Sequence, residues 1–149
     1  MTQRLPPFMM VETDERLKRA ADALARESLI AVDTESNSLY AYRERVCLIQ
    51  ISSRREDYII DPFNIRDMSP LAPLFASSTI EKVFHAATYD VMTMKRDFGY
   101  TFRNLFDTMT AARVCGFRLI GLNNLVSEIV GVQLDKSHQR DDWGRRPLS

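Results

Sequence analysis

Long apolar runs and metal-binding cysteine pairs are missing from this sequence. No stretch reaches the ~18 apolar residues that a membrane-spanning helix needs, so we expect no membrane span. The first ten residues lack the apolar core of a secretion signal, so we expect a cytoplasmic protein. Cys47 and Cys115 lack zinc-ligand spacing, and in a cytosolic chain they are more typical of buried thiols than of a disulfide.

An excess of one charge is also missing, because 20 Lys and Arg residues balance 20 Asp and Glu residues. A strongly basic domain would have indicated a nucleic-acid partner. Neutrality does not exclude that partner, because carboxylates around metal ions and basic residues around a rim can sum to zero. The sequence has the length of one domain and can bury a core without staples, but it does not indicate an oligomeric state.

Apolar residues recur at strand or helical spacing along most of the chain. We predict strands at 29–32, 46–52, 58–60, 82–85 and 104–106. We predict helices at 13–26, 71–75, 88–98, 107–115 and 121–131, after an extended arm over residues 1–12. Strands that alternate with helices after an initial hairpin indicate an α/β layered fold with a mixed sheet.

Two carboxylates stand at the end of the first predicted strand, Asp33 and Glu35. Side chains two positions apart on a strand point to one face, so these two can converge while Thr34 turns away. Carboxylates that crowd together repel and lose solvation, and a divalent cation is the simplest counter-charge. Alternatively, the strand ends at Asp33 and both acids are solvated.

A second polar group lies where the predicted strand 82–85 passes into a helix, at His85 and Asp90. Ligands bind at such junctions in α/β folds. Two simpler explanations stay open, because the helix dipole alone favours an acid in the first turn, and a histidine can be a hydrogen-bonded core residue.

Together these groups resemble the RNase D branch of the DEDD 3′→5′ exonucleases. The similarity covers residues 29–149 in five collinear elements, which read DTESNSLYAYRERVCLIQIS at 33–52, YIIDP at 58–62, HAATYD at 85–90, LFDTMTAARVCG at 105–116 and LDKSHQRDDWGRRPLS at 134–149. Each element alone is weak, but five in order make coincidence improbable.

The resemblance implies an RNase H-like three-layer fold, a mixed central sheet of about five strands flanked by helices, in a single exonuclease domain over residues 1–149. It implies two divalent cations, Mg²⁺ or Mn²⁺, that activate a water and stabilise the leaving 3′ oxygen of RNA. Asp33 would bridge both cations, Glu35 would hold the water-activating one, and Asp90 would hold the second.

Residues elsewhere could contact single-stranded nucleic acid through phosphates or stacked bases. The candidates are Tyr40, Tyr42, Arg43, His85, Lys136, Gln139, Trp143 and Arg145. The alternatives are that the loop holding the first three is a solvated rim, and that Trp143 and Pro147 pin the tail to the domain. Asp107 is explained as a helix N-cap and Gln50 as a sheet residue, so neither is assigned to the site.

One element of the family is missing. After the Arg-Pro-Leu element, the resemblance implies a helix with a Tyr and, one turn later, an Asp that completes the ion site. No Tyr-x-x-x-Asp occurs in these 149 residues. We therefore expect a fragment of a longer enzyme, or a naturally short relative, that binds metal weakly and trims RNA slowly or not at all.

Two other functions stay open. The substrate could be DNA, because no residue here tests convincingly for a 2′-hydroxyl group. The domain could also be a non-catalytic module that binds nucleic acid or a protein, although three intact carboxylates beside a phosphate argue against it.

Overall fold

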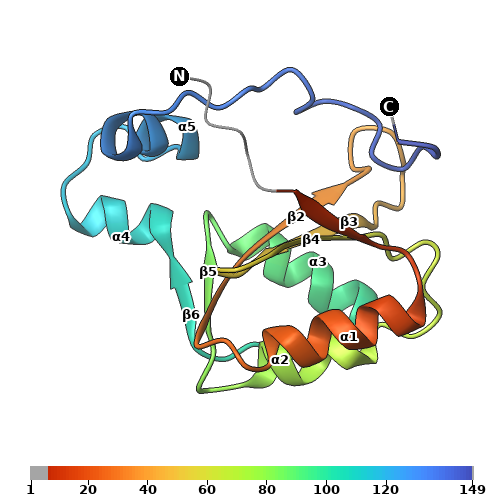
Figure 1. The fold of residues 1–149 in the computed structure, drawn as a ribbon. Coiled ribbons are helices and arrows are strands. Elements are labelled where there is room, and N and C mark those ends of the chain that lie inside the picture. Colours follow the sequence, from red (N-terminus) through yellow and green to blue (C-terminus); the bar gives the residue numbers. More distant parts are fainter. Residues whose placement is uncertain (1–6, 149) are drawn as a thin grey trace.

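The computed structural model describes residues 7–148, which form a six-stranded mixed sheet (Figure 1). The strands, in spatial order, are β1 (Phe8–Val11), β4 (Asp57–Ile60), β3 (Val46–Ser52), β2 (Leu29–Ser36), β5 (Glu81–Phe84) and β6 (Leu105–Asp107). β3 is antiparallel to its two neighbours, whereas the other neighbouring pairs are parallel. The predicted α/β class and mixed sheet are confirmed, with one strand more than the expected five.

The additional strand is β1, which we had predicted as an unpaired extended arm. It pairs in parallel with β4, from Phe8 opposite Asp57 to Val11 opposite Ile60. The rest of the arm, residues 1–6, lies outside the described residues. Pro6 and Pro7 correctly argued against a helix, but a proline is also compatible with the start of an edge strand. A four-residue strand whose partner lies about fifty positions away leaves no signal in local periodicity.

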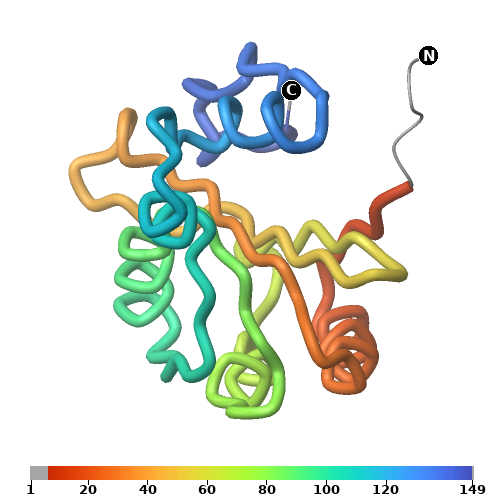
Figure 2. Tube along the Cα trace, turned by 90° about the vertical axis from the view of Figure 1, so that its left-hand side faces the viewer, coloured from red at the N-terminus to blue at the C-terminus, as the bar shows by residue number. Residues whose placement is uncertain are grey.

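Helices α1 (Asp14–Leu24), α2 (Ala72–Ala76) and α3 (Thr88–Phe98) cover the core, and α2 follows a 3-10 turn, η1 (Ser69–Leu71). α1 begins near the predicted start of the first helix, and Thr13 is its N-cap, whose Oγ1 accepts a hydrogen bond of 3.2 Å from Arg16 N. Figures 1 and 2 show α1 and α2 on one side of the sheet and the C-terminal segment on the other. The layer on that second side consists mainly of irregular chain.

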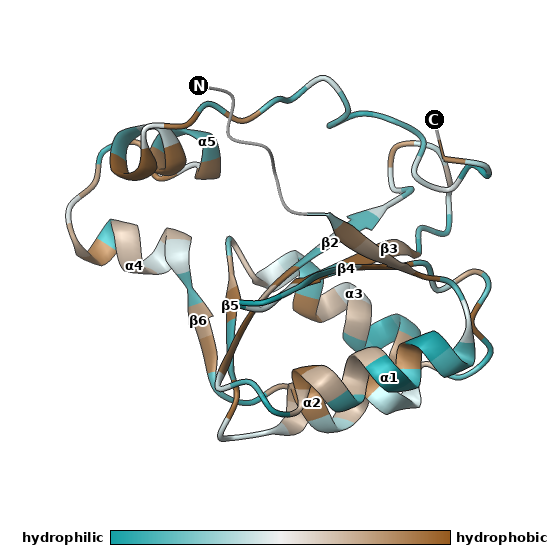
Figure 3. Ribbon diagram, in the orientation of Figure 1, coloured by the Kyte–Doolittle hydropathy of each residue, from teal (hydrophilic) through white to brown (hydrophobic). Residues whose placement is uncertain are grey.

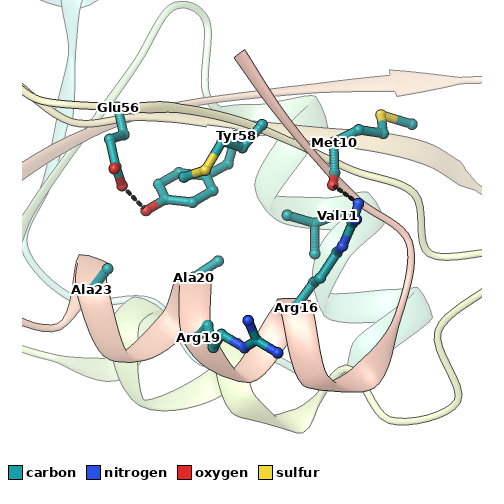
Figure 4. Close-up of a pocket in the computed structure, with 9 residues that line it drawn as sticks. Met10, Val11, Arg16, Arg19, Ala20, Ala23, Glu56 and Tyr58 are labelled. Atoms are coloured by element: carbon teal, nitrogen blue, oxygen red, sulfur yellow. Dashed lines mark hydrogen bonds between the residues drawn. The ribbon is translucent and has the colours of Figure 1, made fainter. Parts of the chain in front are cut away.

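A hollow of about 520 Å³ lies between α1 and the paired strands β1 and β4 (Figure 4). Arg16 Nη1 donates a hydrogen bond of 3.1 Å to Met10 O, and this bond fastens β1 to the helix. Tyr58 donates a hydrogen bond to Glu56 at the other end of the hollow. This hollow shares no lining residue with the cleft described below.

The last helices are α4 (Thr108–Val114) and α5 (Leu122–Leu125), and α5 continues into a π-helix, η2 (Val126–Val130). We had predicted a single regular helix over residues 121–131, where α5 and η2 lie. Its end is as predicted, since Gly131 has a left-handed φ of 74° that glycine adopts without strain. Apolar residues of α4, α5 and η2 line a shared hollow of about 330 Å³. Figure 3 shows hydrophobic residues on the helix formed by α5 and η2. Among residues 7–148, no helix is long and apolar enough to span a bilayer.

Candidate active site

Three parallel strands bring the predicted site residues to one edge of the sheet. β2, β5 and β6 run in the same direction, so their carboxyl ends, which carry Asp33, His85 and Asp107, meet there. A cleft of about 820 Å³ opens at this edge. Asp33 and Glu35 line it on the sheet side, and residues 121–124 and 134–143 contribute its opposite wall.

Alternation along β2 separates the two carboxylates from the core. Ile30 and Val32 are buried, whereas Ala31 and Asp33 are exposed, and Glu35 follows on the exposed face. Thr34 turns to the other face, as predicted. It is not idle there, because its Oγ1 donates a hydrogen bond of 2.5 Å to Asp90 Oδ1. Thr34 therefore ties the second polar group of the sequence to the first.

Burial raises the proton affinity of all three carboxylates, and for Glu35 and Asp90 a neighbouring carboxylate raises it further. Burial, then the neighbouring Asp33 and Asp90, raise the pKa of Glu35 to about 7. Burial also raises the pKa of Asp33, although a backbone hydrogen bond and His85 oppose the shift. For Asp90, burial and Asp33 outweigh the hydrogen bond from Thr34, so its pKa is also raised. No ion pair within residues 7–148 neutralises any of them.

The side chains of Asp33, Glu35 and Asp90 have the chemistry that a hard divalent cation needs, but their positions do not form a cation site. The donors are carboxylate oxygens, which Mg²⁺ and Mn²⁺ prefer, and they lack a positive partner. Yet no three His, Cys, Asp or Glu side chains of the described residues are arranged as a metal cluster. Asp90 does not line the cleft, and its Oδ1 accepts the hydrogen bond from Thr34.

Four of the predicted nucleic-acid contacts line the cleft. They are His85, Lys136, Gln139 and Trp143. His85 Nδ1 lies 2.9 Å from Thr108 Oγ1, a contact that orients the ring. The indole Nε1 of Trp143 is buried and has no hydrogen-bond partner among the described residues. The cleft therefore combines carboxylates, aromatic rings and a lysine in one space.

The other four candidates lie outside the cleft. Tyr42 is fully exposed and borders, with Arg43, a separate hollow of about 500 Å³. Tyr40 is largely exposed, but its hydroxyl donates a hydrogen bond of 2.5 Å to Arg140 O and so joins the β2–β3 loop to the cleft wall. Arg145 is exposed.

The tail is pinned by a residue that the sequence analysis did not single out. Arg146 Nε donates a 2.6 Å hydrogen bond to the buried Asp61 Oδ2, and its Nη2 donates one of 3.1 Å to Cys47 O. The guanidinium also lies 4.5 Å from the ring centre of Phe63. Trp143, one of the two alternative anchors, takes part, because its carbonyl accepts a hydrogen bond of 2.8 Å from Arg146 Nη1. The sequence offered one indication of the ion pair with Arg146, which is that Asp61, an acid, directly follows an apolar strand.

Sequence reasoning also missed several cleft residues. Gln50 pairs with Asp33 in the sheet, as expected, but it lines the cleft as well. The other unpredicted lining residues with polar side chains are Ser52, Thr108, Asn123, Asn124, Asp135 and His138. Except for Ser52 on β3, these residues lie on short helices or in irregular chain. The spacing of apolar residues there does not show which way a side chain points.

Comparison with known proteins decides the family. The sequence pattern described as 3′-5′ exonuclease matches residues 8–149. The chain belongs to the 3′-5′ exonuclease family. It is 42% identical to Protein RRP6-like 3 of Arabidopsis thaliana over 143 residues, which are 95% of this chain and 16% of that protein. The exonuclease fold is equally clear in Escherichia coli RNase D, a solved exoribonuclease involved in structured RNA processing.

That exonuclease superposes with a TM-score of 0.90 at 35% identity, over 97% of this chain and 39% of its own. The resemblance to the RNase D branch and the RNase H-like fold are thereby confirmed. A more distant exonuclease-fold structure, NrnC of Brucella melitensis, has bound Mg²⁺; it is 27% identical with a TM-score of 0.70, over 83% of this chain and 62% of that one. The chain spans well under half the length of RRP6-like 3 and RNase D.

Proposed function

We propose that this chain is the catalytic domain of a metal-dependent 3′→5′ exoribonuclease. It hydrolyses the 3′-terminal phosphodiester of single-stranded RNA. The observation that carries the proposal is a group of three neighbouring carboxylates in a domain of this family, Asp33 and Glu35 in the cleft and Asp90 buried beside them. None of the three forms an ion pair within residues 7–148. We assign residues 1–149 to one domain.

Each carboxylate has a proposed role. When bound, two divalent cations supply an activated water and stabilise the charge that develops on the leaving 3′ oxygen. Asp33 would hold both cations. Glu35 would hold the cation at the attacking water, and Asp90 would hold the second cation directly or through water. For that, the Thr34 hydroxyl leaves one oxygen of Asp90 free.

The walls of the cleft suit a single strand better than a duplex. Trp143 and His85 offer flat rings on which unpaired bases stack, and Lys136 and Gln139 can meet phosphate oxygens. The preference for RNA rests on the RNase D branch and on the Escherichia coli relative, which is an exoribonuclease. The cytoplasmic location stays a prediction of the sequence.

The test is a trimming assay with 5′-labelled single-stranded RNA, Mn²⁺ and the protein in excess, because we expect the 149-residue chain to be slow. A ladder from the 3′ end should appear, vanish with chelator, and vanish in Asp33→Asn. Asp22→Asn, which removes an exposed carboxylate on α1, is the matched control and should trim normally. Trimming that survives Asp33→Asn would refute the proposal.

Two alternatives are decided by the same assay. Faster trimming of a DNA oligonucleotide of identical sequence would make the domain a DNA exonuclease. The absence of a ready metal cluster among residues 7–148 favours, as the second candidate, a non-catalytic module that binds nucleic acid or a protein. Tight RNA binding that neither Mn²⁺ nor Asp33→Asn changes would support that module.

A further inference from the structure

Asp107 does more than the helix cap predicted for it. It ends β6 and precedes α4, and its Oδ1 accepts hydrogen bonds from Met109 N at 2.9 Å and Thr110 N at 3.3 Å. These two bonds are those of an N-cap. They would account for an acid at this position if the carboxylate had no other contact.

The same carboxylate also holds the turn that follows β5. Oδ1 accepts from Ala86 N and Oδ2 accepts from Ala87 N, both at 3.0 Å. Burial alone would raise the pKa of Asp107, but the four backbone N–H groups from Ala87, Ala86, Thr110 and Met109 lower it. One carboxylate thus joins the starts of two helices.

The turn needs such an external partner. Ala86 has a φ of 60°, in the left-handed region that a residue with a Cβ rarely adopts. Ala87, the N-cap of α3, has no side chain that can cap the helix. Asp107 supplies from a neighbouring strand the acceptors that the turn's own sequence lacks. Thr108 adds a contact to His85.

Asp90 lies in the first turn of α3, three residues after Ala87. We propose that Asp107 is a positioning residue for the active site, because it fixes the turn from which Asp90 reaches Thr34, the residue next to Asp33. The inference deepens the proposed function and rests on it for the metal-binding role of Asp90. Asp107 does not line the cleft, so it would act through the turn.

A graded series of variants separates positioning from capping. Asp107→Ser keeps a hydroxyl that can cap α4, but it is too short to reach Ala86 and Ala87. Asp107→Asn, with its oxygen in the Oδ1 position, keeps three bonds and turns an NH₂ group toward Ala87 N. Thr13→Ala, which removes the cap of α1 away from the cleft, is the control for a general loss of a helix cap.

Two readouts besides activity apply: amide hydrogen exchange of residues 85–91 and Mn²⁺ affinity by calorimetry. In Asp107→Ser we expect exchange of the turn to accelerate about tenfold and Mn²⁺ affinity to fall about tenfold, the lower end for a residue that orients metal ligands. Exchange within α4 should stay close to that of the parent. Asp107→Asn should fall between the parent and Asp107→Ser in both measurements. Thr13→Ala should leave Mn²⁺ affinity unchanged.

Parent-like exchange of the turn, or parent-like Mn²⁺ affinity, in Asp107→Ser would overturn the inference. So would an equal loss of affinity in Thr13→Ala, because the effect would then be general destabilisation. A parent chain that neither binds Mn²⁺ nor trims RNA would instead overturn the proposed function. In that case hydrogen exchange of the turn alone still shows whether Asp107 holds it.

Discussion

The two faces of the central sheet are built on different principles, and one strand shows both. On β2, Ile30 and Val32 point into a core of aliphatic and aromatic side chains, whereas Ala31 and Asp33 point toward the cleft. The first face is covered by helices that pack through apolar contacts. The second is covered by a segment fastened through polar contacts, above all Arg146 with Asp61. The comparison teaches that most of the packing and most of the cleft chemistry lie on opposite faces of a single sheet, with the buried Asp90 of α3 as the exception.

The largest effect should come from the packed face. Phe75 is fully buried, with its ring centre 5.0 Å from those of Tyr100 and Phe102. We expect Phe75→Ala to lower the free energy of unfolding by about 3–5 kcal/mol in urea denaturation. Phe8→Ala, at an exposed edge position, is the control and should cost about 1 kcal/mol or less. A loss below ~1 kcal/mol for Phe75→Ala would contradict the division of the faces.

The polar fastening of the opposite face is the next test. Arg146→Ala leaves the buried Asp61 without its partner, so we expect a loss of about 3 kcal/mol and faster hydrogen exchange over residues 134–146. Arg145→Ala is the matched control, because that side chain is exposed, and it should change stability by less than ~0.5 kcal/mol. Equal effects of both variants would show that the segment is not held by Arg146.

The pH dependence of stability should report on the carboxylates of the cleft and not on the apolar core. Between pH 4.5, the ordinary pKa of Glu35, and its folded value of about 7, the folded metal-free chain binds more protons than the unfolded chain. Stability must therefore fall as pH rises through this window, on the order of 1 kcal/mol after solvent screening. Asp33 and Asp90, with raised pKa values, act in the same direction.

Urea denaturation from pH 4.5 to 8 in chelator measures this slope. Glu35→Gln should flatten the slope, and Glu15→Gln, an exposed acid on α1, should keep it. An unchanged slope in Glu35→Gln would mean that the carboxylates do not repel one another.

The smallest effect belongs to the β2–β3 loop, outside the cleft. Tyr42 is fully exposed, so Tyr42→Ala should leave stability unchanged. If its ring stacks on a base, RNA binding should weaken about fivefold, equivalent to ~1 kcal/mol, and Tyr42→Phe should bind normally. Fluorescence anisotropy with a labelled RNA measures the difference. Equal affinity of Tyr42→Ala and the parent would leave the loop as a solvated rim.

Much of the site was predictable because its first elements are local. The order of strands and helices, the caps at Thr13 and Asp107, and the shared face of Asp33 and Glu35 all follow from spacing within a few residues. Four of the eight proposed nucleic-acid contacts reach the cleft, and all four stand beside a strand end or in the segment that forms the opposite wall. The candidates in the β2–β3 loop lie outside the cleft. Their position could not be predicted, because a loop has no regular spacing that sets the direction of its side chains.

The sequence by itself determined the alternation that puts carboxylates and core on opposite faces of β2, because side-chain direction along a strand has a period of two. It also determined where most helices begin and end. Only the tertiary structure decided the contacts between distant positions: β1 with β4, Arg146 with Asp61, and Asp107 with Ala86 and Ala87. Their partners are 20 or more positions apart, and which N–H or carboxylate meets which depends on how the whole sheet assembles.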